Sequence, residues 1–430
     1  MSIADSFKSF LGNLAVDNGD IISSRYGEIT AALNKEFRST DSKTANSLQV
    51  GSYGRWTAIR GISDLDMLYI VPSGAWDEYK SGGQYKLLKK AADAIAARYP
   101  TTIVKVDRLV VRVLYAKFHV EVQPVFELTD GSFRYPDTYY GGSWKVTKPR
   151  EEMAAMTEFD QQKNKNLRRL CKMARAWKNK HGVGMGGLLI DTLAHNFLKS
   201  TTYYDDKSYL YYDWMSRDFF SYLSALSVQE YYGALGSGQR VKVKKNFQKK
   251  AKKAHELCLK AIEAEGTPTQ STKWKKVYGR PFPAQTIEAK KAKLIEAGSE
   301  ARNTEEFFDD LFPIDVRFDI QLECEVIQDG FRPYFLTDAL RQRLRLKRQR
   351  SMRFFVESHN IEGEFTLYWK VLNRGSEAIR RDCIRGQIIK DDGKLERKEA
   401  TDFYGDHVVE CAAVQNGVVV ATDRISVPIE

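Results

Sequence analysis

The chain has 430 residues, of which 43% are hydrophobic and 29% charged, a composition typical of a globular protein with a substantial core. No run of residues approaches the roughly 20 apolar positions that span a bilayer, so we expect no membrane-spanning helix and no membrane partner. The formal net charge of +11 favours a polyanionic partner, which includes nucleotide phosphates, nucleic acid and acidic proteins.

The N-terminus and the cysteines predict a cytoplasmic protein. The first 20 residues lack an apolar stretch followed by a small-residue cleavage site, and we expect a helix there, not a signal peptide. The cysteines are dispersed without CxxC spacing, which favours reduced thiols and argues against a zinc site.

The first 130 residues predict a small mixed α/β unit. Residues 1–40 are expected to be helical with a turn near residues 18–20, and residues 47–71 predict a strand or loop, a short helix and a strand. A helix within 78–98 ends before Pro100. Residues 102–115 and 117–128 predict two strands joined by a tight turn near Ala116 and Lys117.

The pattern becomes helical from residue 150 to about 262 and then changes again. Amphipathic helices are predicted within 164–182, 186–200, 213–227 and 246–266, followed by a charged helical connector over 286–312. From residue 351, five apolar runs are separated by turns near 373–375, 391–393 and 415–417. This spacing predicts a small all-β sandwich or barrel.

Two carboxylates lie one residue apart inside an apolar run, in the stretch GSYGRWTAIRGISDLDMLYIV (51–71). In a strand, Asp64 and Asp66 point to the same side, where two anions repel unless a cation lies between them. Mg²⁺ takes carboxylate and phosphate oxygens. A pair of such ions about 4 Å apart can activate an attacking hydroxyl and stabilise a leaving phosphate. We therefore predict that this strand holds metal and a nucleoside triphosphate.

Two further elements complete the predicted site. Glu121, in the run HVEVQPVF, offers a third carboxylate on a neighbouring strand. Gly51 lets the backbone approach phosphate closely, and backbone amides together with the Ser52 hydroxyl can donate hydrogen bonds to a triphosphate. An isolated Asp-x-Asp or Gly-Ser is usually structural, so the prediction depends on the combination and its order along the chain.

The combination resembles the polymerase-β-like nucleotidyltransferase superfamily, whose pattern is Gly-Ser, a spacer and Asp-x-Asp on a strand. Together with GGSWKVTKPR (141–150), LRRLCKMARAWK (167–178) and WKKVYGRPFP (274–283), it is similar to the bacterial cGAS/DncV-like nucleotidyltransferases, or CD-NTases. These are relatives of the animal cyclic GMP–AMP synthase. The resemblance covers about residues 1–285.

The C-terminal residues carry a second resemblance. Residues 352–430 are similar to the adenylyl/guanylyl cyclase and SMODS-associated sensor domain that often follows such synthases. The residues that match its signature are Trp369, Asn373, Gly375, Arg385, Gly386, Gly405, His407, Glu410 and Cys411.

The resemblance implies an α+β fold: a bilobal nucleotidyltransferase over 1–285, with a mixed sheet lobe over about 1–150 and a helical lobe over about 151–285. A connector over 286–350 and a β-sandwich-like sensor domain over 351–430 would follow. It implies an enzyme that joins NTPs, ATP and/or GTP, into a cyclic oligonucleotide messenger for anti-phage defence. The messenger would bind an effector protein.

The resemblance also implies roles for single residues. Asp64, Asp66 and Glu121 would be catalytic and would bind two Mg²⁺ ions, with Mn²⁺ as an alternative, while Gly51, Ser52 and Lys172 would bind the nucleotide. The third acid of this family is most often aspartate, so Glu121 is a departure that puts activity in question. Where relatives often have a serine, this chain has glycines within 184–187, whose amides could bind phosphate instead.

Other features leave alternatives open. Trp56, Tyr139, Tyr140 and Trp144 can stack on a base or pack in a core. The basic runs 240–253 and 341–353 are either solvated or contact nucleic acid or another polyanionic, phage-derived activator. The spacing around His359 and His407 is poor for zinc.

Two rival functions follow from the same residues. One is a template-independent RNA nucleotidyltransferase similar to poly(A) polymerase, which shares this plan of active site. The other is a nucleotide-binding sensor whose catalysis has decayed, with Glu121 as the remnant.

Overall fold

The computed structural model describes residues 2–61, 63–116, 118–284, 306–328, 330–373, 376–381, 385–402 and 404–430. The chain divides into two compact units, one of residues 1–177 and 186–283 and one of residues 178–185 and 284–430. Residues 286–305 of the predicted connector and residues 374–375 of a predicted turn lie outside the described residues. No described helix combines the length and the apolar character needed to cross a membrane.

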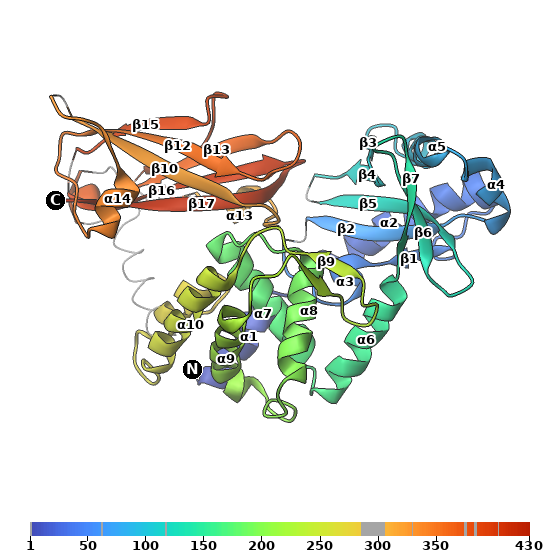
Figure 1. Cartoon of the computed structure of the whole chain (residues 1–430), viewed down its shortest axis with the longest axis horizontal. Coiled ribbons are helices and arrows are strands. Elements are labelled where there is room, and N and C mark those ends of the chain that lie inside the picture. Colours follow the sequence, from blue (N-terminus) through green and yellow to red (C-terminus); the bar gives the residue numbers. More distant parts are fainter. Residues whose placement is uncertain are drawn as a thin grey trace. The chain divides into compact units, whose positions relative to one another are not determined.

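The first unit contains a seven-stranded sheet with the order β1-β2-β5-β4-β3, which β6 and β7 extend from β5 (Figure 1). Only β2 and β5 are parallel among these pairs. The strands are β1 (Ser47–Gln49), β2 (Asp64–Ile70), β3 (Ile103–Asp107), β4 (Val110–Leu114), β5 (His119–Glu127), β6 (Phe133–Asp137) and β7 (Ser143–Thr147).

Burial on this sheet explains why the carboxylates are presented as they are. Leu65 and Met67 of β2 and Val120 and Val122 of β5 face the main core, which α2 (Gly19–Arg38) and α5 (Gln84–Arg98) complete. Because side chains alternate along a strand, the residues between them point to the opposite face. A smaller apolar cluster around Leu68, Val125 and Phe133 covers that opposite face further along the strands.

Residues 102–115, predicted as one strand, form the hairpin β3–β4, so this prediction is wrong. The turn contains no Gly, Asn or Pro, and apolar residues continue through it. Arg108 instead takes a left-handed conformation with φ of +45°, and its guanidinium makes two hydrogen bonds to Asp137, at 2.9 and 3.0 Å. A distant carboxylate therefore stabilises a turn that local sequence does not announce. Lys117, in the other predicted turn, lies outside the described residues.

Apart from a two-stranded sheet of β8 (Tyr231–Gly233) and β9 (Arg240–Lys242), the rest of the described first unit is mainly helical. Its longer helices are α1 (Ile3–Asn13), α6 (Pro149–Gln162), α7 (Asn166–His181), α8 (Gly187–Lys199), α9 (Tyr212–Ala225), α10 (Gln248–Ile262) and α11 (Gln270–Tyr278). The four residues at the end of α7 belong to the second unit. Helix α1 packs among these helices, because Phe7 and Phe10 contact Trp274, Tyr278 and Phe282. The N-terminal residues thus join the helical lobe, although the sequence places them with the sheet lobe.

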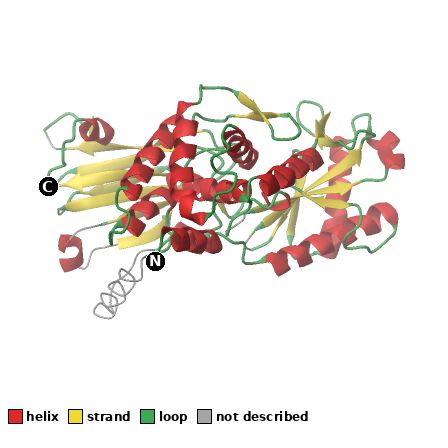
Figure 2. Cartoon of the chain, turned by 90° about the horizontal axis from the view of Figure 1, so that it is seen from below, coloured by secondary structure: helices red, strands yellow, loops and turns green. Residues whose placement is uncertain are grey.

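The second unit contains two four-stranded sheets, ordered β11-β10-β12-β15 and β14-β13-β16-β17, around one core. Figure 2, with strands in yellow, shows long strands of this unit running side by side near the C-terminus. Its strands are β10 (Ile320–Ile327), β11 (Tyr334–Phe335), β12 (Ser351–His359), β13 (Thr366–Leu372), β14 (Arg385–Lys390), β15 (Glu396–Ala400), β16 (Gly405–Gln415) and β17 (Val418–Ile429).

Strands β10, β11 and β15 of this unit were not predicted, although β10 alternates apolar residues along IQLECEVI. Strand β10 lies in the segment expected to be a connector, yet it pairs with β12 along its whole length. Strand β15 reads ERKEA and lies at the edge of its sheet. Charged edge strands protect a sheet against pairing with other chains, which explains the missing apolar pattern. The predicted α+β class with an all-β C-terminal domain is confirmed.

Candidate active site

Strands β2 and β5 bring two pairs of polar side chains together. Asp64 lies opposite His119 and Asp66 opposite Glu121 in the parallel register. All four point away from the face that packs against α2 and α5. The two strands predicted to carry the carboxylates therefore lie side by side and present them on the same face.

Three of these residues have potential ligand atoms within 4.8 Å of one another: Asp64, His119 and Glu121. They form the only group with such spacing among the His, Cys, Asp and Glu residues that the structure describes. Asp66 is not one of the three, although its Cα pairs with that of Glu121. Ser63 supports the arrangement, since its hydroxyl donates to Asp64 Oδ1 at 2.7 Å.

Two residues of this cluster escaped prediction from the sequence. Arg112 on β4 reaches Glu121 Oε1 with Nη2 at 3.0 Å and Asp107 Oδ2 with Nη1 at 3.0 Å. His119, which is 4% exposed, places Nε2 3.4 Å from Glu121 Oε1. The alternation of HVEV could have identified His119, because residues two apart in a strand share a face. No local pattern indicates Arg112, whose partner is nine residues away.

Gly51 lies directly against Asp66. Its φ is +64°, and a Cβ built on it would lie 1.8 Å from Asp66 Oδ2. The Val50 amide donates to the Asp66 carbonyl at 2.9 Å, which holds the glycine beside the strand. Only glycine fits this position, because any side chain would displace the carboxylate. Ser52 follows in the short helix α3 (Gly51–Gly54).

A buried ion-pair network holds the Gly-Ser loop, residues 51–57, against the helical lobe. Asp191 of α8 is fully buried and accepts hydrogen bonds from Arg55 Nε at 2.9 Å, Thr57 Oγ1 at 3.1 Å and Arg175 Nη1 at 2.6 Å. Burial alone would raise the pKa of Asp191, but Arg175 and Arg55 outweigh it and lower that pKa to about 2. Glu152 also contacts Arg55, at 3.4 Å.

Lys172 differs from the two arginines on its face of α7. Arg168 contacts Asp160 and donates from Nε to the Arg55 carbonyl at 3.2 Å, and Arg175 is bound to Asp191. Lys172 lies between the two arginines in sequence and is half-buried. It makes no ion pair with any carboxylate in the described part of the chain. Burial first, and then Arg168 and Arg175, lower the pKa of Lys172. An anionic ligand would relieve this unfavourable environment.

The aromatic candidates separate into packed and exposed residues. Trp144 packs edge-to-face on Trp76 at 4.9 Å. Arg108 lies over the ring of Tyr139 at 4.5 Å. Tyr139, Tyr140 and Trp56 are exposed, and of these only Trp56 lies in the Gly-Ser loop. Trp56 is therefore the aromatic residue best placed to meet a base.

Among the glycines before α8, Gly184 is a poor candidate for binding phosphate. Gly184 belongs to the second unit, where its built Cβ would lie 2.4 Å from Asp319 Oδ2. A carboxylate so close disfavours a phosphate at Gly184.

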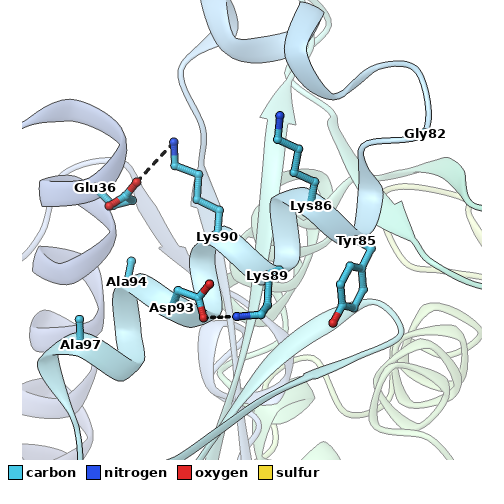
Figure 3. Close-up of a pocket in the computed structure, with 9 residues that line it drawn as sticks. All are labelled: Glu36, Gly82, Tyr85, Lys86, Lys89, Lys90, Asp93, Ala94 and Ala97. Atoms are coloured by element: carbon cyan, nitrogen blue, oxygen red, sulfur yellow. Dashed lines mark hydrogen bonds and ion pairs between the residues drawn. The ribbon is translucent and has the colours of Figure 1, made fainter.

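The hollow of about 780 Å³ between α2 and α5 is not this site (Figure 3). Those helices cover the sheet face opposite the carboxylates. The lysines of the hollow are neutralised nearby, since Lys90 pairs with Glu36 at 3.3 Å and Lys89 pairs with Asp93.

The signature residues of the second unit are mainly structural. Trp369 and Cys411 are buried in the sandwich core, and the Trp369 indole donates to Asp391 at 2.7 Å. Asn373, Arg385 and His407 line a small cavity of about 40 Å³. Gly375 lies outside the described residues.

Comparisons with known proteins agree with both halves of this description. Residues 1–160 match the family model of the Second Messenger Oligonucleotide or Dinucleotide Synthetase (SMODS) domain. Residues 302–430 match that of the Adenylyl/Guanylyl and SMODS C-terminal sensor domain. None of the curated proteins compared with the chain matches it by sequence.

Two solved structures are similar to part of the chain, and the first supports the fold. The chain is similar to CdnC of E. coli MS115-1, solved as a CdnC:HORMA-deltaN complex, with 16% identity and a TM-score of 0.51 over 65% of this chain and 98% of that one. A mutant of the Vibrio cholerae di-nucleotide cyclase DncV has 13% identity and a TM-score of 0.48 over 65% of this chain and 87% of that one.

The SMODS match and the CdnC-like fold confirm the predicted enzyme class, a nucleotidyltransferase with a polymerase-β-like fold. As the sequence predicted, the two matched segments resemble a cGAS/DncV-like nucleotidyltransferase domain and the sensor domain that follows it.

Proposed function

We propose that this enzyme joins nucleoside triphosphates, ATP and/or GTP, into a cyclic oligonucleotide with the help of two Mg²⁺ or Mn²⁺ ions. The observation that supports the proposal is the register of β2 and β5, in which Asp66 lies opposite Glu121 and Asp64 opposite His119, with Gly51 against Asp66. The donor set suits a hard divalent cation, and the absence of a side chain at Gly51 leaves the Asp66 carboxylate in place.

In each round, a 3′- or 2′-hydroxyl of one nucleotide attacks the α-phosphorus of a bound NTP. A P–O bond forms, the bond between the α-phosphorus and the bridging oxygen breaks, and pyrophosphate leaves. The bound cations would neutralise charge on the phosphates. Glu121 orients the attacking hydroxyl or takes its proton. A second round on the linear product closes the ring.

The Gly-Ser loop and α7 bind the triphosphate. Amides near Gly51 and the Ser52 hydroxyl donate to phosphate oxygens, while Lys172 supplies a positive charge that no carboxylate of the described residues neutralises. Arg168 joins α7 to the loop through the Arg55 carbonyl, and Asp191 fixes Arg55 and Arg175 together. These contacts support a triphosphate site shared by the loop and the helix.

By its family, the product would be a diffusible messenger that activates an effector protein in anti-phage defence, in the cytoplasm. A phage-derived or other polyanionic activator would start synthesis. The C-terminal unit, which carries the basic run 341–353, is the part of the chain that we connect with such a signal.

A nucleotide-binding sensor whose catalysis has decayed is the second candidate. Arg112 forms an ion pair with Glu121 at 3.0 Å, and this pair competes with metal binding by the carboxylate. Labelled ATP and GTP with Mg²⁺ separate the alternatives. Small phosphatase-resistant products support cyclisation, extension of added RNA supports a tailing enzyme, and NTP binding without turnover supports the sensor. The Asp66→Asn variant must remove every product, since turnover by that variant would refute the metal assignment.

A further inference from the structure

The second unit carries a strongly basic loop that the proposed active site does not use. This basic loop, residues 341–350 (RQRLRLKRQR), contains five arginines, one lysine and no acid. It connects α14 (Leu336–Arg341) to β12, and nearly all of its residues are exposed. Such runs are often merely solvated, so what matters is whether the loop has a fixed shape and unneutralised charge.

Backbone hydrogen bonds fix the shape of the basic loop. Leu346 is 1% exposed; its amide donates to Pro428 O at 2.8 Å, and its carbonyl accepts from the Glu430 amide at 2.8 Å. The Gln349 amide donates to Thr401 O at 2.7 Å. The buried Thr401 hydroxyl bridges the loop, accepting from the Arg350 amide at 2.7 Å and donating to the Lys347 carbonyl at 3.0 Å. The loop is thus held against the ends of β15 and β17.

The charges that this fixed loop presents are largely unneutralised. Arg343, Lys347, Arg348 and Arg350 form no ion pair with any carboxylate of the described residues. Arg341, by contrast, pairs with Asp338 at 2.7 Å. Four cations in one short, pre-shaped segment repel one another, and a bound polyanion would remove that repulsion.

The chemistry of the basic loop favours nucleic acid among polyanions. Arginine outnumbers lysine, and guanidinium groups match phosphate oxygens with paired hydrogen bonds. Arg348 lies over the ring of Tyr404 at 4.5 Å, and that ring is 50% exposed, so a stacking surface lies beside the cations. An anionic membrane would require an adjoining apolar face, and within the loop Leu344 is the only exposed apolar side chain.

We infer that the basic loop binds the phosphate backbone of nucleic acid, with Arg343, Lys347 and Arg348 as the principal contacts. The inference is independent of the chemistry proposed for the active site. It assigns nucleic acid as the ligand class of the sensor domain and the basic loop as the surface that binds it. Because the contacts are to phosphate, we expect little dependence on base sequence.

The test measures binding of the full chain, without NTP, to labelled RNA and double-stranded DNA of mixed sequence over a series of salt concentrations. For the wild type, the logarithm of the association constant should fall linearly with the logarithm of salt. Replacing Arg343, Lys347 and Arg348 together by alanine should weaken binding and reduce that slope by about 3. Synthesis measured without nucleic acid should not change.

The matched control removes three exposed cations that already have carboxylate partners: Arg341, Arg380 and Lys394. It lowers the net charge equally, so the inference predicts the wild-type slope. Thermal melts confirm that both triple variants are folded. Equal slopes in the two variants, no binding by the wild type, or tighter binding to acidic peptides or anionic vesicles than to either nucleic acid would overturn the inference.

Discussion

Replacing Gly51 by alanine tests how closely the Gly-Ser loop approaches the metal-binding strand. The new Cβ would lie 1.8 Å from Asp66 Oδ2 and 2.7 Å from its Cγ. To reach an ordinary contact of 3.4 Å, the oxygen must move by about 1.6 Å, the difference between the two distances. The carboxylate is the end of a side chain, so it can turn away, and the structure survives while the ligand geometry is lost.

The magnitudes separate the two effects. Alanine in the left-handed conformation costs about 1–2 kcal/mol of folding free energy. A displacement of this size at a reacting centre can lower turnover by about 10²-fold. Gly82 supplies the matched control: its φ of +75° is equally left-handed, but a Cβ there would meet nothing within 4 Å. Gly82→Ala should carry the same cost in stability and leave turnover unchanged.

Unfolding by denaturant measures the stability of both variants, and kcat measured with labelled NTPs measures turnover. We expect similar losses of stability in the two variants and a fall in kcat for Gly51→Ala alone. If Gly51→Ala turns over as fast as Gly82→Ala, the contact with Asp66 has no catalytic consequence and the assignment of this loop is wrong.

Three further substitutions address the other parts of the site. Lys172→Met should weaken NTP binding, measured by titration, about tenfold. It should not lower the melting temperature, because the fold disfavours the charged form of Lys172. NTP binding as tight as that of the wild type would refute the role of Lys172. Glu121→Gln should lower kcat by about 10²-fold or more, and wild-type turnover would support the decayed sensor. Asp191→Asn should cost about 3–5 kcal/mol, because it leaves Arg55 and Arg175 buried without their partner; denaturant unfolding near neutral pH tests this.

The same carboxylate predicts how stability depends on pH. The pKa of Asp191 falls from its ordinary value of 3.8 to about 2 in the fold, so its stabilising contribution is complete above 3.8. It is lost as pH falls from about 3.8 to about 2, where the folded form also takes up the proton. The wild type should therefore lose more stability than Asp191→Asn across this interval. Equal losses would show that the carboxylate is not held charged by its arginines.

The carboxylate strands could be predicted from the sequence because the pattern that identifies them lies within each strand. Alternation along DLDMLYIV and HVEVQPVF fixes which side chains face the core, and the parallel register then places Asp66 opposite Glu121. The Gly-Ser motif likewise indicates that the backbone closely approaches a neighbouring group. The metal-binding and nucleotide-binding roles of these residues remain predictions, which the variants above test.

The parts that escaped prediction depend on contacts between distant segments. The β3–β4 turn requires Asp137 to hold Arg108, and the pairing of β10 with β12 joins segments about 30 residues apart. The three cations on one face of α7 looked equivalent in sequence. Only the fold shows that Arg168 and Arg175 are occupied by Asp160 and Asp191.

That difference among the cations explains why a buried charge network lies beside a phosphate site. Buried ion pairs add little net stability, since desolvation offsets their attraction. Here, however, Asp191 joins the Gly-Ser loop to α7 and takes up the two arginines that could otherwise compete for phosphate. Lys172 is left as the cation whose unfavourable environment only an anion can relieve. On this view the network determines which charge meets the nucleotide, and its loss should weaken NTP binding even in molecules that remain folded.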